Sequence, residues 1–253
     1  YGGDSNYGTI FLQDTTVPQI LGDIIINSAN DVTFQGPIKA VSVTQSAGTG
    51  ITSFNAVVEV AGGNMSIITS SVAINNNISV SGSTSIYTDG GITQNPGADI
   101  SSGGAITIYA DYDNNGTGTF TMSSGCDLTV TSSGAITIDS RGNMVLYTVT
   151  NRGSADITIG NNRKPDSVSL QGVISNSNTA TGTLTIYSNG GIVQNANLGS
   201  ATYPFADVYL YVDQDNTGVA AFTSTSRIIY ASSNVYVEPN TNTTLTIGGF
   251  SIT

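Results

Sequence analysis

Short runs of alternating apolar and hydroxyl residues recur along the chain. In each run two branched residues flank a polar one, so an extended strand would turn both branched side chains to the same side. Gly, Ser and Asn separate the runs, and strong helix formers are scarce. The pattern predicts short strands with one buried face at residues 41–43, 78–80, 106–108, 128–130, 136–138, 157–159, 184–186, 235–237 and 245–247.

Part of the sequence is repeated about 100 residues later. Residues 86–97 and 186–197 are identical at seven of twelve positions. The match extends to an internal duplication in which residues from about 84 to 139 correspond to residues from about 184 to 239. Smaller strand–turn units of about 20 residues recur inside each block. Nested repeats of this kind are typical of solenoids, in which each turn buries its apolar face on the next.

The sequence therefore predicts an all-β fold in which residues 1–253 form a single right-handed parallel β-solenoid, or β-helix, with short strands and Asn/Gly/Ser corners. At roughly 20 residues per coil and about 4.8 Å per layer, we expect about 12 coils and a rod about 60 Å long. Two β-sandwich repeats are the alternative. Because the strand pattern runs on to residue 253 without a capping segment, we expect the chain to continue into a longer one or to stack on copies of itself.

The composition excludes the common catalytic groups that depend on His, and we expect no enzyme activity. Without His, the chain cannot build a Ser-His-Asp or Cys-His nucleophile or a His-based zinc site. The single cysteine, Cys126, aligns with the region of Ile228 in the second block, which predicts a small core residue. A formal net charge of −11 argues against nucleic acid as a partner, and no apolar run is long enough for a membrane helix.

The sharpest local pattern is Asp111, Asp113 and Asn115 at alternate positions, followed by glycine. Alternating oxygen side chains before a Gly turn match the first half of a calcium loop. The second block keeps Asp213 and Asp215. The sequence therefore predicts weak calcium binding by Asp111, Asp113 and Asn115 in the first block and by these two aspartates in the second. Two observations favour a plain corner turn instead: the usual bidentate Glu is missing, and Asp, Asn and Gly are common turn residues.

The segments 31–38, 45–54 and 108–120, together with repeated Gly-x-Ile-Thr-Ile units, resemble the repeat region of very large secreted bacterial exoproteins. These are the filamentous-haemagglutinin-like repetitive surface proteins. The resemblance covers most of the chain, but it lies in the style of the repeats. It implies a β-helix, an extracellular or cell-surface location, and a role in adhesion, matrix building or surface filaments. It assigns no functional residues.

We therefore expect a structural or adhesive segment of an extracellular or cell-surface fibre, whose partners are copies of itself, neighbouring repeats or surface glycans. A glycan-binding or glycan-cleaving β-helix is the alternative. Exposed tyrosines could stack on sugars, and the Asp pairs could in principle act on a glycosidic bond, although Trp is absent and no aromatic cleft is evident. A minor alternative is an ice-binding solenoid, suggested by the Thr-x-Thr rows.

Overall fold

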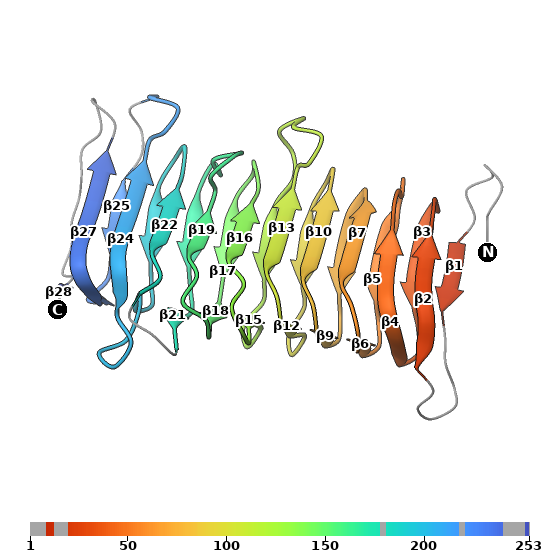
Figure 1. Cartoon of the computed structure of the whole chain (residues 1–253). Helices are drawn as coiled ribbons and strands as arrows, with labels where there is room; N and C mark the ends of the chain where they lie inside the picture. Colours follow the sequence, from red (N-terminus) through yellow and green to blue (C-terminus); the bar gives the residue numbers. More distant parts are fainter. Residues whose placement is uncertain (1–8, 13–19, 178–180, 218–220, 240–250, 253) are drawn as a thin grey trace.

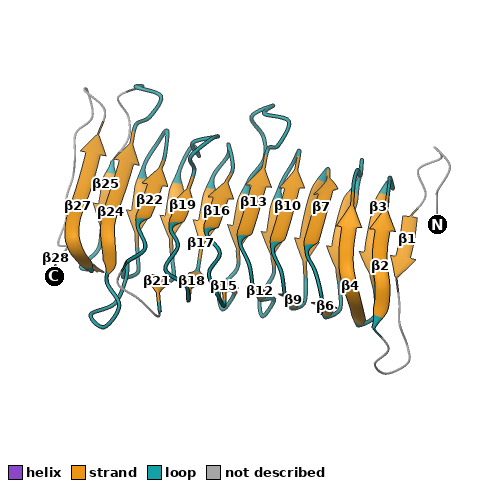
Figure 2. Cartoon of the chain, in the orientation of Figure 1, coloured by secondary structure: helices purple, strands orange, loops and turns teal. Residues whose placement is uncertain are grey.

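The computed structural model shows a stack of β-coils along one axis (Figure 1). It describes residues 9–12, 20–177, 181–217, 221–239 and 251–252. Over these residues the chain forms strands, turns and loops without any helix (Figure 2). All the strand pairs are parallel and join successive coils, so the predicted β-solenoid is confirmed, and the alternative of two sandwiches is wrong.

Each coil has three sides, which we call A, B and C. Side A is a ten-stranded parallel sheet. Its strands, in order along the rod, are β1 (Thr9–Leu12), β3 (Asp31–Phe34), β5 (Ile51–Phe54), β8 (Ser71–Ile74), β11 (Ile92–Gln94), β14 (Phe120–Met122), β17 (Met144–Leu146), β20 (Val168–Leu170), β23 (Ile192–Gln194) and β25 (Phe222–Ser224).

Sides B and C belong to one 16-stranded sheet that bends at β4 (Ile38–Gln45). The first half of β4 pairs with side B and the second half with side C. Side B continues through β6 (Val58–Val60), β9 (Ile78–Val80), β12 (Ile100–Ser102), β15 (Asp127–Val130), β18 (Thr148–Asn151) and β21 (Ile174–Asn176). A short pair, β26 (Ile228–Ile229) and β28 (Ser251–Ile252), is bridged to side B through Leu198.

Side C faces the viewer in Figure 1. It begins with β2 (Leu21–Ile26), which pairs with β4. Its further strands are β7 (Met65–Thr69), β10 (Thr84–Thr88), β13 (Ile106–Ala110), β16 (Ile136–Asp139), β19 (Ile157–Ile159), β22 (Leu184–Tyr187), β24 (Phe205–Val212) and β27 (Ala231–Pro239).

The solenoid has about nine turns, so the expectation of about 12 coils is wrong. The first coils have the expected length, because Val72 pairs with Ile92 on side A. Later coils are longer: Ile92 pairs with Phe120, and Ile192 pairs with Phe222. The extra residues lie in corner loops and add no layer to the stack. Nine layers correspond to a rod of roughly 45 Å.

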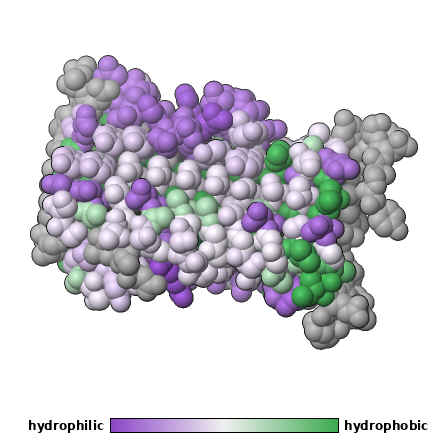
Figure 3. Space-filling model, viewed as in Figure 1, coloured by the Kyte–Doolittle hydropathy of each residue, from purple (hydrophilic) through white to green (hydrophobic). Residues whose placement is uncertain are grey.

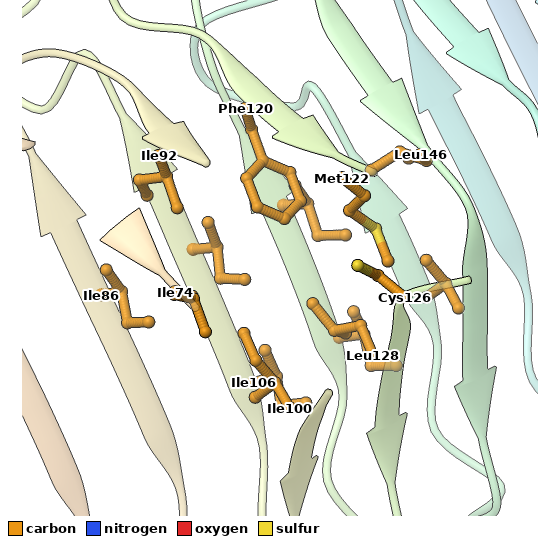
Figure 4. Close-up of a cluster of buried hydrophobic side chains, with 14 of the residues drawn as sticks. Ile74, Ile86, Ile92, Ile100, Ile106, Phe120, Met122, Cys126, Leu128 and Leu146 are labelled. Carbon is orange, nitrogen blue, oxygen red and sulfur yellow. The ribbon is translucent and has the colours of Figure 1, made fainter. Parts of the chain in front are cut away.

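The core is a continuous apolar column enclosed by the three sides, and Figure 4 shows one part of it. Phe34 and Phe54 stack in neighbouring coils, with ring centroids 4.7 Å apart and planes 14° apart. Cys126 is fully buried, and its thiol lies 2.9 Å from the carbonyl oxygen of Asn95. The prediction that Cys126 is a core residue is therefore confirmed.

The strand pattern succeeds for most of the predicted runs and fails at the bend. Both branched residues are buried in the six runs from 78–80 to 184–186. Val41 is 40% exposed, because residues 41–42 form the corner of β4, so the prediction that residues 41–43 bury both valines is wrong. In the run 235–237 both valines are only half-buried, and residues 245–247 lie outside the described residues.

Candidate functional site

Two loops with the predicted acidic motif project from the same edge of side C (Figure 1). Each begins with an aspartate in a left-handed conformation, Asp111 with φ 71° and Asp213 with φ 58°. Three residues later Asn114 and Asn216 both have φ 60°. Their amides donate to the carbonyl oxygens of Asp111 and Asp213 at 3.1 and 3.0 Å. The two motifs therefore form the same turn, four coils apart.

The second aspartate of each motif is engaged within its own turn. Asp113 accepts hydrogen bonds from the backbone amide of Asn115 at 3.3 Å and from its side-chain amide at 2.8 Å. In the other loop, Asp215 accepts from the amide of Thr217 at 3.2 Å and from its hydroxyl at 3.1 Å. Such short-range bonds are typical of Asx turns. This geometry agrees with the corner-turn interpretation of the motif.

The first aspartate of each motif is buried rather than presented to solvent. One carboxylate oxygen of Asp111 accepts from the amide of Gly116 at 2.9 Å. Its other oxygen is buried and has no hydrogen-bond partner among the described residues. Over the same residues no group of three Asp, Glu, Cys or His side chains is placed to hold a metal ion. Calcium binding by Asp111, Asp113, Asn115, Asp213 and Asp215 stays a prediction.

A further acid lies beside the first loop. Partial burial raises the pKa of Asp89 above its usual value, and the negative charges of Asp113 and Asp111 raise it further. The upper rim of side C, where the loops lie, is the most hydrophilic part of the face seen in Figure 3. Most of the surface below this rim is close to neutral in hydropathy, apart from a hydrophobic patch at the N-terminal coils.

The sequence analysis missed a buried aspartate that anchors a third loop. Asp139 accepts hydrogen bonds from the backbone amides of Asn162 and Arg163 at 2.8 and 3.0 Å. Burial raises the pKa of Asp139, and these hydrogen bonds partly oppose that rise. Arg163 in turn donates to the carbonyl oxygen of Tyr112 at 2.8 Å, which ties this loop to the first acidic loop. The sequence carried one signal for this residue: both 106–108 and 136–138 read Ile-Thr-Ile, and Asp139 follows the second run where Tyr109 follows the first.

Tyrosines form two clusters on side C with different ring geometry. In the first, Tyr87 contacts Tyr109 edge-on, with centroids 5.3 Å apart, and Tyr112 at a tilt of 55° and a distance of 5.0 Å. Tyr112 is 46% exposed. The second cluster is a stacked group at the C-terminal coils, in which facing rings are nearly parallel. Its members are Tyr187, Tyr209, Tyr211 and Tyr236.

The outward surface is otherwise dominated by short neutral side chains in register. On side C one column consists only of hydroxyl residues over seven successive coils: Thr44, Ser66, Ser85, Thr107, Thr137, Thr158 and Thr185. At the corner after side A, the side-chain amides of four successive coils form a ladder of hydrogen bonds: Asn55 donates to Gln35, Asn75 to Asn55, and Asn95 to Asn75. Over its described residues the chain has no helix long and apolar enough to cross a membrane.

Comparisons with known protein families, with curated proteins and with solved structures give no match. The resemblance to filamentous-haemagglutinin-like exoproteins therefore stays a prediction that rests on repeat style alone.

Proposed function

We propose that this solenoid is a structural and adhesive segment of an extracellular or cell-surface fibre, which continues into further coils of a longer chain or of a second copy. The observation that carries the proposal is the parallel pairing of successive coils over about nine turns, with one register shift in the described residues, between β24 and β27. From β4 to β21 the described coils are hydrogen-bonded to their neighbours on three sides, which makes a stiff rod. Only 9% of the residues are charged, but their net charge of −11 makes copies of the rod repel one another, so close lateral packing needs screening by salt.

Side-chain ladders on the outside support a mechanical role. The amide of Asn75 donates to Asn55 at 2.7 Å, and the amide of Asn95 donates to Asn75. These bonds run along the rod axis and reinforce the backbone ladder at a corner. In the outward hydroxyl column of side C the residues are short, so neighbouring rods could approach closely.

Sedimentation and negative-stain electron microscopy of the purified chain test the proposal, together with digestion by a nonspecific protease. Under the proposal the chain assembles into filaments, or remains as single rods that resist proteolysis for hours under conditions that degrade a flexible chain. In filaments, fibre diffraction should show an axial spacing of about 4.8 Å. A monomer that the protease degrades rapidly would overturn the structural role.

Glycan binding is a second candidate, and the first tyrosine cluster favours it. Tyr112 is 46% exposed on a projecting loop, beside the acidic Asp113 and the tilted ring of Tyr87. Sugar-binding surfaces commonly combine an exposed aromatic face with polar groups that accept hydrogen bonds from hydroxyls. The stacked cluster is less suited to this role, because its facing rings cover one another.

A glycan array probed with the chain and with Tyr112→Ala distinguishes this candidate. Binding that depends on Tyr112, with Tyr203→Ala as a matched exposed-tyrosine control, would support it. If no glycan is retained, or if both variants bind as the parent does, this site is not a sugar site. The assembly experiment is independent of either result.

A further inference from the structure

Four tyrosines of side C form two stacked pairs between neighbouring coils. Tyr187 and Tyr211 are paired in register in β22 and β24, with ring centroids 4.7 Å apart and planes 8° apart. Tyr209 and Tyr236 are paired in β24 and β27, at 4.8 Å and 1°. The latter distance equals the spacing of adjacent strands, so one ring is related to the next by a simple translation. Equivalent carbon atoms of the two rings therefore lie about 4.8 Å apart.

Solvent reaches the rings of both stacked pairs. Tyr236 is 47% exposed, while Tyr209 and Tyr211 are half-buried. Tyr209 also lies near Tyr211 on the same strand, with centroids 6.2 Å apart, so the two pairs form one group of four rings. Phenols held in this way have their oxidisable oxygen at the surface and their ortho carbons beside those of a neighbour.

We propose that Tyr209 and Tyr236 are a site of dityrosine formation when the protein meets a haem peroxidase and hydrogen peroxide. Each phenol loses one electron and one proton to the oxidised haem, which leaves two tyrosyl radicals. The radicals couple through one ortho carbon of each ring, and a new carbon–carbon bond forms. Each coupled carbon then passes its hydrogen to the phenolic oxygen, and both phenols are restored. Hydrogen peroxide takes up the two electrons and two protons and becomes two molecules of water.

The fold supplies what coupling needs, because two radicals must meet in the right orientation before they decay. The strand pairing between β24 and β27 holds the rings together, which removes the diffusional step. The product is a covalent bond between two coils. Like a disulfide, it would stabilise the fold mainly by restricting the unfolded chain. This inference does not depend on the proposed fibre role.

The sequence offers a direct readout with trypsin. Arg227 is the only basic residue between positions 209 and 236, and none follows it, so trypsin places the two tyrosines on different peptides. After treatment of the dilute full chain with peroxidase and peroxide, we expect a monomer on a denaturing gel. Its digest should contain the two peptides joined, lighter by two hydrogen atoms and with the blue fluorescence of dityrosine.

Phenylalanine variants identify the residues that react. Tyr209→Phe and Tyr236→Phe keep the ring but lose the phenol, and each is expected to abolish the joined peptide. Tyr203→Phe is the matched control, since Tyr203 is exposed and lies on the same tryptic peptide as Tyr209; it should leave the yield unchanged. The proposal is overturned if no joined peptide forms in the parent chain. It is also overturned if the joined peptide persists in Tyr236→Phe, or if cross-links form only between molecules.

Discussion

Replacing Phe54 by alanine should destabilise the rod locally. Phe54 is fully buried in β5 and stacks on Phe34 of the preceding coil at 4.7 Å. Truncating a buried Phe to Ala costs about 3–5 kcal/mol, because apolar contacts are lost and a cavity remains. Part of this cost, roughly 0.5–1.5 kcal/mol, is the interaction between the two rings. Phe54→Leu keeps most of the apolar volume and loses mainly the ring interaction, so it is the matched control.

The location of the effect follows from the architecture. In a solenoid each coil contacts only its neighbours, so a defect should weaken the coils around β5 and leave distant coils unaffected. The strands bonded to β5 are β3 and β8. The strand β22 lies several coils away along side C and serves as the internal reference.

Hydrogen exchange measured by mass spectrometry tests both the size and the location. Since each 1.4 kcal/mol changes an equilibrium about tenfold, amides of β3, β5 and β8 should exchange roughly 10²- to 4 × 10³-fold faster in Phe54→Ala. Amides of β22 should exchange at the parent rate. Equal acceleration in β22 would refute the picture of independent coils. Acceleration of less than about tenfold in β5 would refute the packing argument.

Three further results are expected. Gly118→Ala should lower the melting temperature in a thermal unfolding scan and cost roughly 1–3 kcal/mol, since the added Cβ would lie 2.1 Å from the backbone nitrogen of Asp111. Gly22→Ala, whose added Cβ would meet open space, is the control for this thermal scan. Asn75→Ala breaks one donated and one accepted bond of the exposed amide ladder and should cost about 1 kcal/mol in urea unfolding. Because burial raises the pKa of Asp139, its contribution to stability is fully present below the unfolded pKa of about 3.9 and is lost as the pH rises through the folded pKa. Urea unfolding of the parent at pH 3 and pH 7 should therefore show a loss of stability with rising pH that is smaller in Asp139→Asn, where the raised pKa of Asp89 still contributes, and equal pH dependence in both proteins would contradict this.

The local alternation of apolar and hydroxyl residues determined much of the fold. Tertiary information was not needed to predict that Ile106 and Ile108 share one face of a strand, since an extended chain places alternate residues on the same side. The nested repeats then favoured a solenoid, because in that fold each repeat buries its apolar face by stacking on the next repeat. The burial of Cys126 followed from its alignment with an apolar region of the second block.

Tertiary structure decided what depends on coil length and on contacts between loops. The number of turns could not be counted from sequence, because a loop such as 111–119 lengthens a coil without adding a layer. Val41 continues the alternation but sits at a corner, and only the pairing of β4 with two different strands reveals this. The contact of Arg163 with Tyr112 joins residues two coils apart. The stacking of Tyr209 on Tyr236 likewise depends on the register between coils, which no local pattern encodes.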